Sequence, residues 1–362
     1  MSIFQKKWVQ GLIVAILIFM LVYLISITKF IFAPVGAYLL SIAVPIIGAG
    51  LLYYITMPVV RRLEQMRIHR ILAIIIVFLL IIGVIYLTSN FIAPIVQEQF
   101  TRLTDNIPKM VESGEKLIDN WRDNQDMIPS QIDSTIENIT NNLNDYAQNF
   151  VGFLIDFLGQ LFGFLFAFVL IPFFLFFMLK DGHKFVPFIS QFLSTKKADS
   201  FRRLADSINH TLASFIQGQF IVSVCVGFML YIGYLIIHLP YSLTLALFGL
   251  IMNFIPFVGP FLSAIPAVLV AFFQDPMMAV WAILVMVIAQ QIESNLISPN
   301  VMGKVLSLHP LTIITLILAA GSIAGFIGLL FIIPAYAVVK TIISHFYHEW
   351  QKKQPQDDQK IF

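Results

Sequence analysis

Two interruptions in long apolar stretches hold the residues of this chain that are best suited to bind a solute. The first is the broken segment, Asn253-Phe-Ile-Pro-Phe-Val-Gly-Pro260. Pro256 and Pro260 each lack a backbone donor, and Gly259 allows φ values that other residues avoid, so this segment cannot form a regular helix. Non-helical backbone is tolerated at membrane depth only where protein buries it or where it lines a wet cavity. We therefore interpret the broken segment, with Asn253, as part of a transport pathway; the alternative is a kink that serves only packing.

The second interruption, Gln290–Asn300, places amides, hydroxyls and one carboxylate in a single stretch. Gln290, Gln291 and Asn295 supply the amides, and on a helix Gln291 and Asn295 share a face because they are four residues apart. Glu293 is an acid among apolar neighbours, where an ionisable group costs at least about 2.5 kcal/mol on insertion scales. Glu293 is therefore a candidate to bind a cation or a proton, unless it lies beside water at the interface.

The composition indicates that both interruptions lie in a membrane protein. Of the 362 residues, 59% are hydrophobic and only 12% are charged, and the mean hydropathy is +0.87. Soluble domains are about half apolar and about one quarter charged, whereas several spans of about 20 apolar residues account for the observed values. The net charge of +2 does not indicate a basic surface that would bind a nucleic acid. The expected partners are the lipid bilayer and a small polar solute or a monovalent cation.

The first half of the chain is predicted to combine spans with a polar hairpin. Residues 1–96 hold the first three transmembrane spans, and residues 151–180 form the fourth. Between them, residues 97–150 repeat apolar side chains every three or four positions, which predicts an amphipathic helical hairpin outside the bilayer. Residues 181–211 show the same period and are interpreted as an amphipathic linker on the cytoplasmic side.

The second half, residues 212–340, is predicted as a transmembrane bundle that contains the broken segment, followed by a cytoplasmic tail at residues 341–362. If residues 239–273 cross the membrane once, the fold is an all-α polytopic bundle of about eight spans. If they form a re-entrant hairpin, every later connection lies on the opposite side of the membrane from the one expected for a single crossing. The sequence leaves both possibilities open.

The last span is expected to run from Leu311 to about Val339 as one helix. Gly321 and Gly325 within it have the spacing at which small residues let two membrane helices approach closely. The sequence therefore predicts a packing role for these glycines.

Basic residues predict the orientation, because loops rich in Lys and Arg stay on the cytoplasmic side. Basic clusters occur at residues 6–7, 61–70 and 180–203, and all three fall on one side if the spans alternate. The acidic hairpin then lies outside. We expect a multi-pass protein of the plasma membrane with both termini in the cytoplasm.

Motifs of catalysis and cofactor binding are absent from the sequence. No Gly-x-x-x-x-Gly-Lys-Ser/Thr phosphate loop occurs. His348-Glu349 begins like the zinc motif His-Glu-x-x-His, but Lys352 takes the place of the second histidine. Cys225 is the single cysteine, so no intrachain disulfide can form. We expect neither an enzyme nor a bound cofactor or metal.

Several short motifs together carry a resemblance to a known family. They are Pro256-Phe-Val-Gly-Pro260, the amide-rich stretch that ends at Pro299, Gly303-Lys304, His309-Pro310-Leu311 and the glycine-rich final span near Pro334. With them, nearly the whole chain resembles the autoinducer-2 exporter family of bacterial membrane proteins. The resemblance implies a permease of the bacterial cell membrane and a homo-oligomer. Some relatives export autoinducer-2 and others are sodium or lithium/proton antiporters, so the resemblance leaves the substrate open.

Three functions remain open at the level of the sequence. The first is a secondary exporter of a small polar solute, with hydroxyl groups bound by the broken segment and by the amides of Gln290, Gln291 and Asn295. The second is a sodium(lithium)/proton antiporter that uses Glu293; it ranks lower because such carriers often pair their membrane carboxylates. The third is a non-transporting membrane scaffold that acts through the external hairpin.

Overall fold

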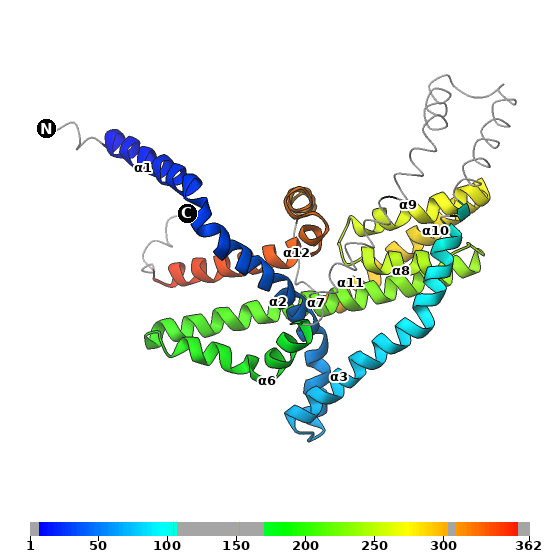
Figure 1. The fold of residues 1–362 in the computed structure, drawn as a ribbon, viewed down its shortest axis with the longest axis horizontal. Coiled ribbons are helices and arrows are strands. Elements are labelled where there is room, and N and C mark those ends of the chain that lie inside the picture. Colours follow the sequence, from blue (N-terminus) through cyan, green and yellow to red (C-terminus); the bar gives the residue numbers. More distant parts are fainter. Residues whose placement is uncertain (1–6, 104, 107–151, 153–169, 303–308, 354–362) are drawn as a thin grey trace, which may run out of the picture.

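A computed structural model gives the fold for residues 7–103, 105, 106, 152, 170–302 and 309–353 (Figure 1). Most of the predicted external hairpin and of the fourth span lies outside these described residues, as do Gly303-Lys304 and the end of the tail. Every described element is a helix. The elements are α1 Lys7–Ile27, α2 Lys29–Gln65, α3 Arg70–Leu87, η2 Thr88–Ile92, α6 Leu170–Ser190, α7 Thr195–Ile236, α8 Ser242–Met252, α9 Gly259–Gln274, α10 Pro276–Ile292, η5 Glu293–Ile297, α11 Ser298–Met302 and α12 Pro310–Lys353.

Apolar helices dominate the described residues, as predicted. Six of them are long and apolar enough to cross a membrane. They are Val9–Ile27, Ala33–Gln65, Arg70–Leu103, Thr195–Ile236, Pro276–Met302 and Gly328–Gln351. Three further apolar helices are shorter, Ser242–Met252, Gly259–Gln274 and Leu311–Gly325. The predicted fold class, an all-α polytopic helical bundle, is confirmed.

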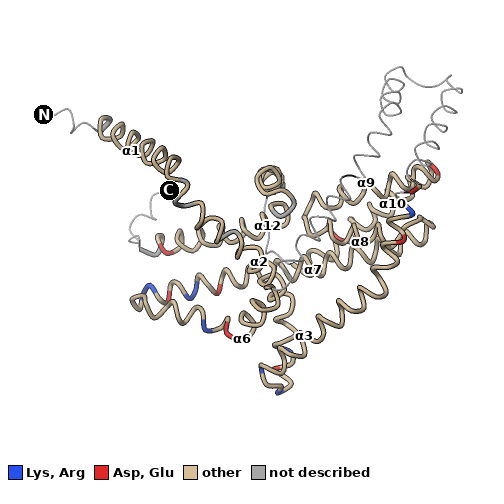
Figure 2. Tube along the Cα trace, in the orientation of Figure 1, with Lys and Arg blue, Asp and Glu red and all other residues tan. Residues whose placement is uncertain are grey.

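Charged residues are distributed unevenly along the molecule. In Figure 2, Lys and Arg gather at the α2–α3 connection and around the α6–α7 turn, whereas acids predominate at the opposite end, where Asp275 joins α9 to α10 and the continuation of α3 carries Glu98 and Asp105 beside Arg102. This separation agrees with the charge asymmetry expected between the two sides of a membrane. The direction in which the chain is inserted stays a prediction.

The apolar core is divided between two groups of helices. One cluster joins α2, α3 and α6, where Leu175 and Leu179 pack with Ile74. A second joins α7, α8, α9 and α10, and a smaller third cluster packs Phe215 of α7 against Ile333 of α12. Helix α7 contacts members of both groups and is the central element of the fold.

A hydrogen bond between side chain and backbone connects α7 to α2 at a proline. Pro58 lies inside α2 and has no N–H, so the carbonyl of Tyr54, four residues earlier, lacks its helical donor. Gln217 of α7 donates its Nε2–H to that oxygen at 2.8 Å. The amide therefore satisfies a carbonyl that the proline leaves free.

Replacing Gln217 by leucine is expected to lower the free energy of unfolding by about 1–3 kcal/mol, because the part-buried Tyr54 carbonyl loses its donor. Denaturant unfolding in detergent micelles measures this difference. Asn209→Leu, at an exposed position of the same helix, is the control and should change stability by less than about 0.5 kcal/mol. Equal effects at the two positions would contradict the assignment.

The broken segment is the turn of a helical hairpin. Residues 253–258 form turns between α8 and α9, and Phe257 has a φ of +65°. The two helices run antiparallel, since Gly249 and Ser263, which are equally far from Pro256 in the chain, lie side by side. With 11 and 16 residues, α8 and α9 are about 17 and 24 Å long, both less than the roughly 30 Å of a hydrocarbon core. This is the geometry of the re-entrant alternative and not that of one crossing.

The start of this hairpin is held by the helical continuation of α3. Gln99 accepts hydrogen bonds at its Oε1 from the Thr244 hydroxyl at 2.7 Å and from the Thr244 backbone N–H at 3.1 Å. Asn106 donates to the Tyr241 hydroxyl at 3.0 Å. Polar contacts therefore fix α8 at the end of the molecule opposite the basic clusters.

The final span predicted over residues 311–339 is not one continuous helix. Gly325 has φ +55° and ψ −139°, and Figure 1 shows the first half of α12 nearly end-on while the second half runs across the view. A Cβ on Gly328 would lie 2.3 Å from the Ala320 carbonyl oxygen, and one on Gly321 would lie 3.1 Å from Leu329. These glycines thus permit a sharp break within α12, where the sequence predicted a packing role.

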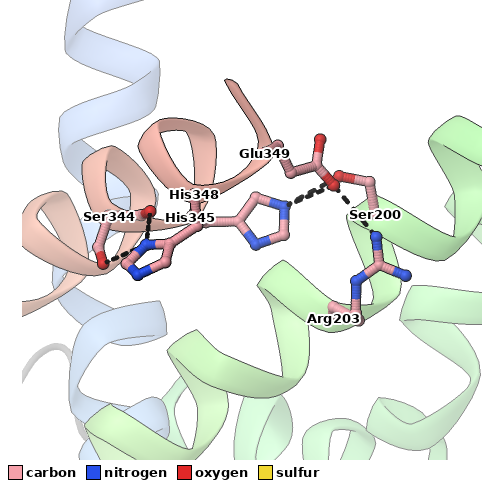
Figure 3. A network of polar contacts seen from close by, with 6 residues as sticks. All are labelled: Ser200, Arg203, Ser344, His345, His348 and Glu349. Atoms are coloured by element: carbon pink, nitrogen blue, oxygen red, sulfur yellow. Dashed lines mark hydrogen bonds and ion pairs between the residues drawn. The ribbon is translucent and has the colours of Figure 1, made fainter. Parts of the chain in front are cut away.

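The second half of α12 packs beside the first half of α7 through polar contacts (Figure 3). The Ser200 hydroxyl lies 2.9 Å from His345 Nε2, and Arg203 donates to Glu349 Oε1 at 3.1 Å. His345 Nε2 also lies 3.6 Å from the same carboxylate oxygen. Residues 341–353, predicted as part of the tail, thus continue α12 and dock on α7.

The Arg203–Glu349 contact is expected to contribute little, because the Arg203 side chain is 62% exposed. In a double-mutant cycle of Arg203→Met and Glu349→Gln, we expect a coupling energy of about 0.2–1 kcal/mol that falls at high salt. Thermal or denaturant unfolding of the four proteins measures the coupling. A salt-independent coupling above about 2 kcal/mol would show that this contact is stronger than an exposed ion pair.

Candidate functional site

A cavity of about 520 Å³ lies where α7, the broken segment, the α10–η5–α11 region and α12 meet. The hairpin supplies one wall through the tip between α8 and α9. The region around η5 supplies most of the polar side chains of the lining. Ile313 and Ile333, one from each half of α12, complete the lining with apolar side chains. Elements from well-separated parts of the sequence therefore surround one space.

Most of the residues singled out from the sequence line this cavity. From the two interruptions these are Asn253, Pro256, Pro260, Gln290, Gln291 and Glu293. The two interruptions, which the sequence could not place relative to each other, thus face the same space. Their role in transport stays a prediction.

Gly259 and Asn295 do not line the cavity. Each instead has a structural role next to residues that do. A Cβ on Gly259 would lie 2.0 Å from the carbonyl oxygen of Met252, so this glycine lets α9 begin directly against the end of α8. Asn295 Nδ2 lies 2.8 Å from Gln291 Oε1 and holds that side chain at the cavity wall. The predicted shared face of Gln291 and Asn295 is confirmed by this contact.

The second interruption includes a π-helical turn, which the sequence did not indicate. Residues Glu293–Ile297 have π-helical hydrogen bonding between α10 and α11. Such turns are rare and are frequently found at functional sites. Ser294 and Ser298 line the cavity together with Glu293, so this region presents hydroxyls beside its carboxylate.

Gln219, a buried amide of α7, also lines the cavity and was not among the predicted site residues. Gln219 donates its Nε2–H to the backbone carbonyl of Asn253 at 2.5 Å, and Asn253 in turn reaches the Ser223 hydroxyl at 3.5 Å. A polar amide in an apolar span was a weak signal for this position. Its partner lies on another element, and no spacing in the sequence indicates that the two residues meet.

The lining combines an apolar surface with polar side chains and one acid. Amides, hydroxyls and the aromatic rings of Phe257 and Phe261 face the cavity, and no Lys, Arg or His is among the described residues that line it. Glu293 is the charged group there, and it forms no ion pair within the described part of the chain. Such a surface can bind hydroxyl groups or a cation, and its carboxylate repels anions.

Comparison with known proteins agrees with this architecture. Residues 5–348 match the AI-2E family transporter. "Putative transport protein YueF" of Bacillus subtilis (strain 168) is 37% identical over 331 residues, which cover 89% of each chain. "Putative transport protein YrrI" of the same organism is 27% identical over 92% of this chain and 94% of its own length. "Putative permease PerM" of Escherichia coli (strain K12) is 27% identical over 51% of this chain and 52% of its own. The chain therefore belongs to the AI-2E family of membrane transporters.

Proposed function

We propose that this transporter is a secondary permease that exports a small, neutral, polar solute through the cavity beside the broken segment. The observation that carries the proposal is the cavity lining, in which amides and hydroxyls from two distant interruptions converge without a basic residue among the described positions. A neutral solute rich in hydroxyl groups exchanges hydrogen bonds with such a surface at little electrostatic cost. An anion would meet Glu293 with no compensating cation in the described lining.

Metabolite profiling of cells with and without the protein, followed by efflux from proteoliposomes, tests this function. We expect a neutral solute to accumulate in cells that lack the protein and to leave wild-type proteoliposomes. Ser298→Phe, which places a ring in the cavity wall, should lower that efflux at least tenfold, whereas the exposed Ser322→Phe should leave it unchanged. Absence of flux for every solute and cation would favour the third alternative, a membrane scaffold that does not transport.

A second candidate is a sodium(lithium)/proton antiporter. It is supported by the position of Glu293, a carboxylate in the cavity wall with no ion pair in the described residues. An unpaired acid at membrane depth is a common element of proton and cation pathways. The lining amides would then supply further oxygen ligands to the cation.

We also propose that copies of the chain assemble into a homo-oligomer in the bacterial plasma membrane, with both termini in the cytoplasm. Helix α1 supports the assembly, because none of its apolar window is buried within the chain and its surface is free for lipid or another copy. The separation of basic and acidic ends supports the orientation (Figure 2). Mass photometry of the purified protein and reporter fusions at the two termini test these two statements.

A further inference from the structure

Gln219 occupies a position that connects the cavity wall of α7 to the hairpin tip. Its side chain lies in the protein interior, with 7% of the residue exposed, and its Nε2 is 2.5 Å from the carbonyl oxygen of Asn253. That carbonyl stands just beyond the end of α8, where residues 253–258 leave the helix, so it has no regular helical donor. Gln219 supplies a donor from a different element.

The partner determines which way the Gln219 amide faces. A backbone carbonyl can only accept hydrogen bonds, so the amide must turn its N–H₂ toward Asn253. The opposite orientation would place two oxygens against each other and leave a buried carbonyl without a donor. Gln219 also lines the cavity, and among the described residues its Oε1 has no hydrogen-bond partner. The amide oxygen is therefore the group that α7 offers to the cavity.

A comparison with Gln217 shows that this arrangement is specific to one face of α7. Gln217 lies two residues earlier and bonds to Tyr54 of α2, on the other side of the helix. The two glutamines thus hold carbonyls of different elements, but Gln219 alone of the pair lines the cavity. Gln217 is for this reason a matched control.

We infer that Gln219 is both a positioning and a specificity-determining residue. Its N–H holds the broken segment in place, and its carbonyl oxygen accepts a hydrogen bond from a donor group, such as a hydroxyl, of the transported solute. The second role rests on the proposed transport function, whereas the first is a property of the fold. Loss of the amide should therefore displace the hairpin tip and weaken solute recognition.

The positioning role can be tested without a solute by Gln219→Glu. At low pH the neutral carboxyl group carries an O–H that can replace the amide donor, whereas the ionised carboxylate cannot donate and is repelled by the Asn253 carbonyl. A trifluoromethyl label on Phe261→Cys, in a background with Cys225→Ser, reports the position of the start of α9 by fluorine NMR. Apart from the glutamate introduced at position 219, Glu293 is the acid among the described residues that line this cavity. Glu293→Gln is therefore included in every protein to remove its titration.

We expect the labelled Gln219→Glu protein to give the parent signal at low pH and a second signal that grows as the pH rises. The parent and the Gln217→Glu control should show one unchanged signal over the same range. Gln219→Met, which is similar in length but has no donor, should show the second signal at every pH and serves if the glutamate variant does not fold. A single parent-like signal in both Gln219 variants would overturn the positioning role.

The recognition role is measured with the solute that profiling identifies. Gln219→Met should raise the half-saturating concentration for efflux at least tenfold, with a smaller change in maximal rate, while Gln217→Met should alter neither. An unchanged half-saturating concentration would refute recognition by Gln219. If wild-type proteoliposomes release no solute at all, the proposed function fails, and the fluorine spectra still decide the positioning role.

Discussion

Replacement of Gly259 by leucine is expected to abolish transport by breaking the hairpin at its tip. A Cβ at this position would lie 2.0 Å from the carbonyl oxygen of Met252 and 2.6 Å from its carbonyl carbon. Both atoms belong to backbone, so no side-chain rotation can relieve the clash. The added side chain would push α9 away from α8 and disturb the packing around Ser263 and Gly249. Overpacking of this kind typically costs about 1–3 kcal/mol.

The measurement is solute efflux from proteoliposomes, with the amount of folded protein determined by size-exclusion chromatography. Gly83→Leu is the matched control, because a Cβ at Gly83 meets nothing within 4 Å. We expect efflux to fall below a tenth of wild type for Gly259→Leu and to stay near wild type for Gly83→Leu. Full activity of the Gly259 variant would show that the hairpin tip can be remodelled without loss of the pathway.

The position of the broken segment could be predicted because its cause is local. Pro256 and Pro260 remove donors from their own helix, and Gly259 acts through its own lack of a side chain, so the residue types alone indicate a non-helical stretch. Whether the chain then crosses or turns back depends on what α8 packs against. The contact of Gly249 with Ser263 decides this, and no pattern in the sequence indicates it.

The break in α12 shows how one residue type supports two interpretations. Glycines four residues apart suit the close packing of two helices, and a glycine also permits the positive φ of a sharp turn. The sequence favoured packing at Gly321 and Gly325, but φ at Gly325 is +55°. The choice between these roles depends on the backbone direction on both sides, which nonlocal contacts set.

The lining residue Gln219 was missed because its significance comes from its partner. The Asn253 carbonyl belongs to a segment that folds back onto α7, and its need for a donor exists only after α8 has ended. By contrast, Gln291 and Asn295 could be paired in advance, since helical spacing alone brings them together. Local geometry was predictable from the sequence, and contacts between elements were not.

Replacing Glu293 by glutamine should separate the two candidate functions, because the variant keeps the size of the side chain and one acceptor oxygen and removes its charge. If the chain exchanges sodium or lithium for protons, we expect cation flux in everted vesicles to fall at least hundredfold. If it exports a neutral solute, we expect efflux to change less than tenfold. Asp275→Asn is the control, because Asp275 caps α10 through the Met277 N–H and lies outside the cavity lining.

The pH dependence of flux through the wild-type protein provides an independent test of the Glu293 carboxylate. A protonated carboxyl and an amide are both neutral, so lowering the pH should make wild-type flux approach that of Glu293→Gln, while the variant itself should depend little on pH. Equal pH dependence in the two proteins would exclude Glu293 as the titrating group. Loss of neutral-solute efflux in Glu293→Gln, with Asp275→Asn active, would instead show that the carboxylate of Glu293 is required for export.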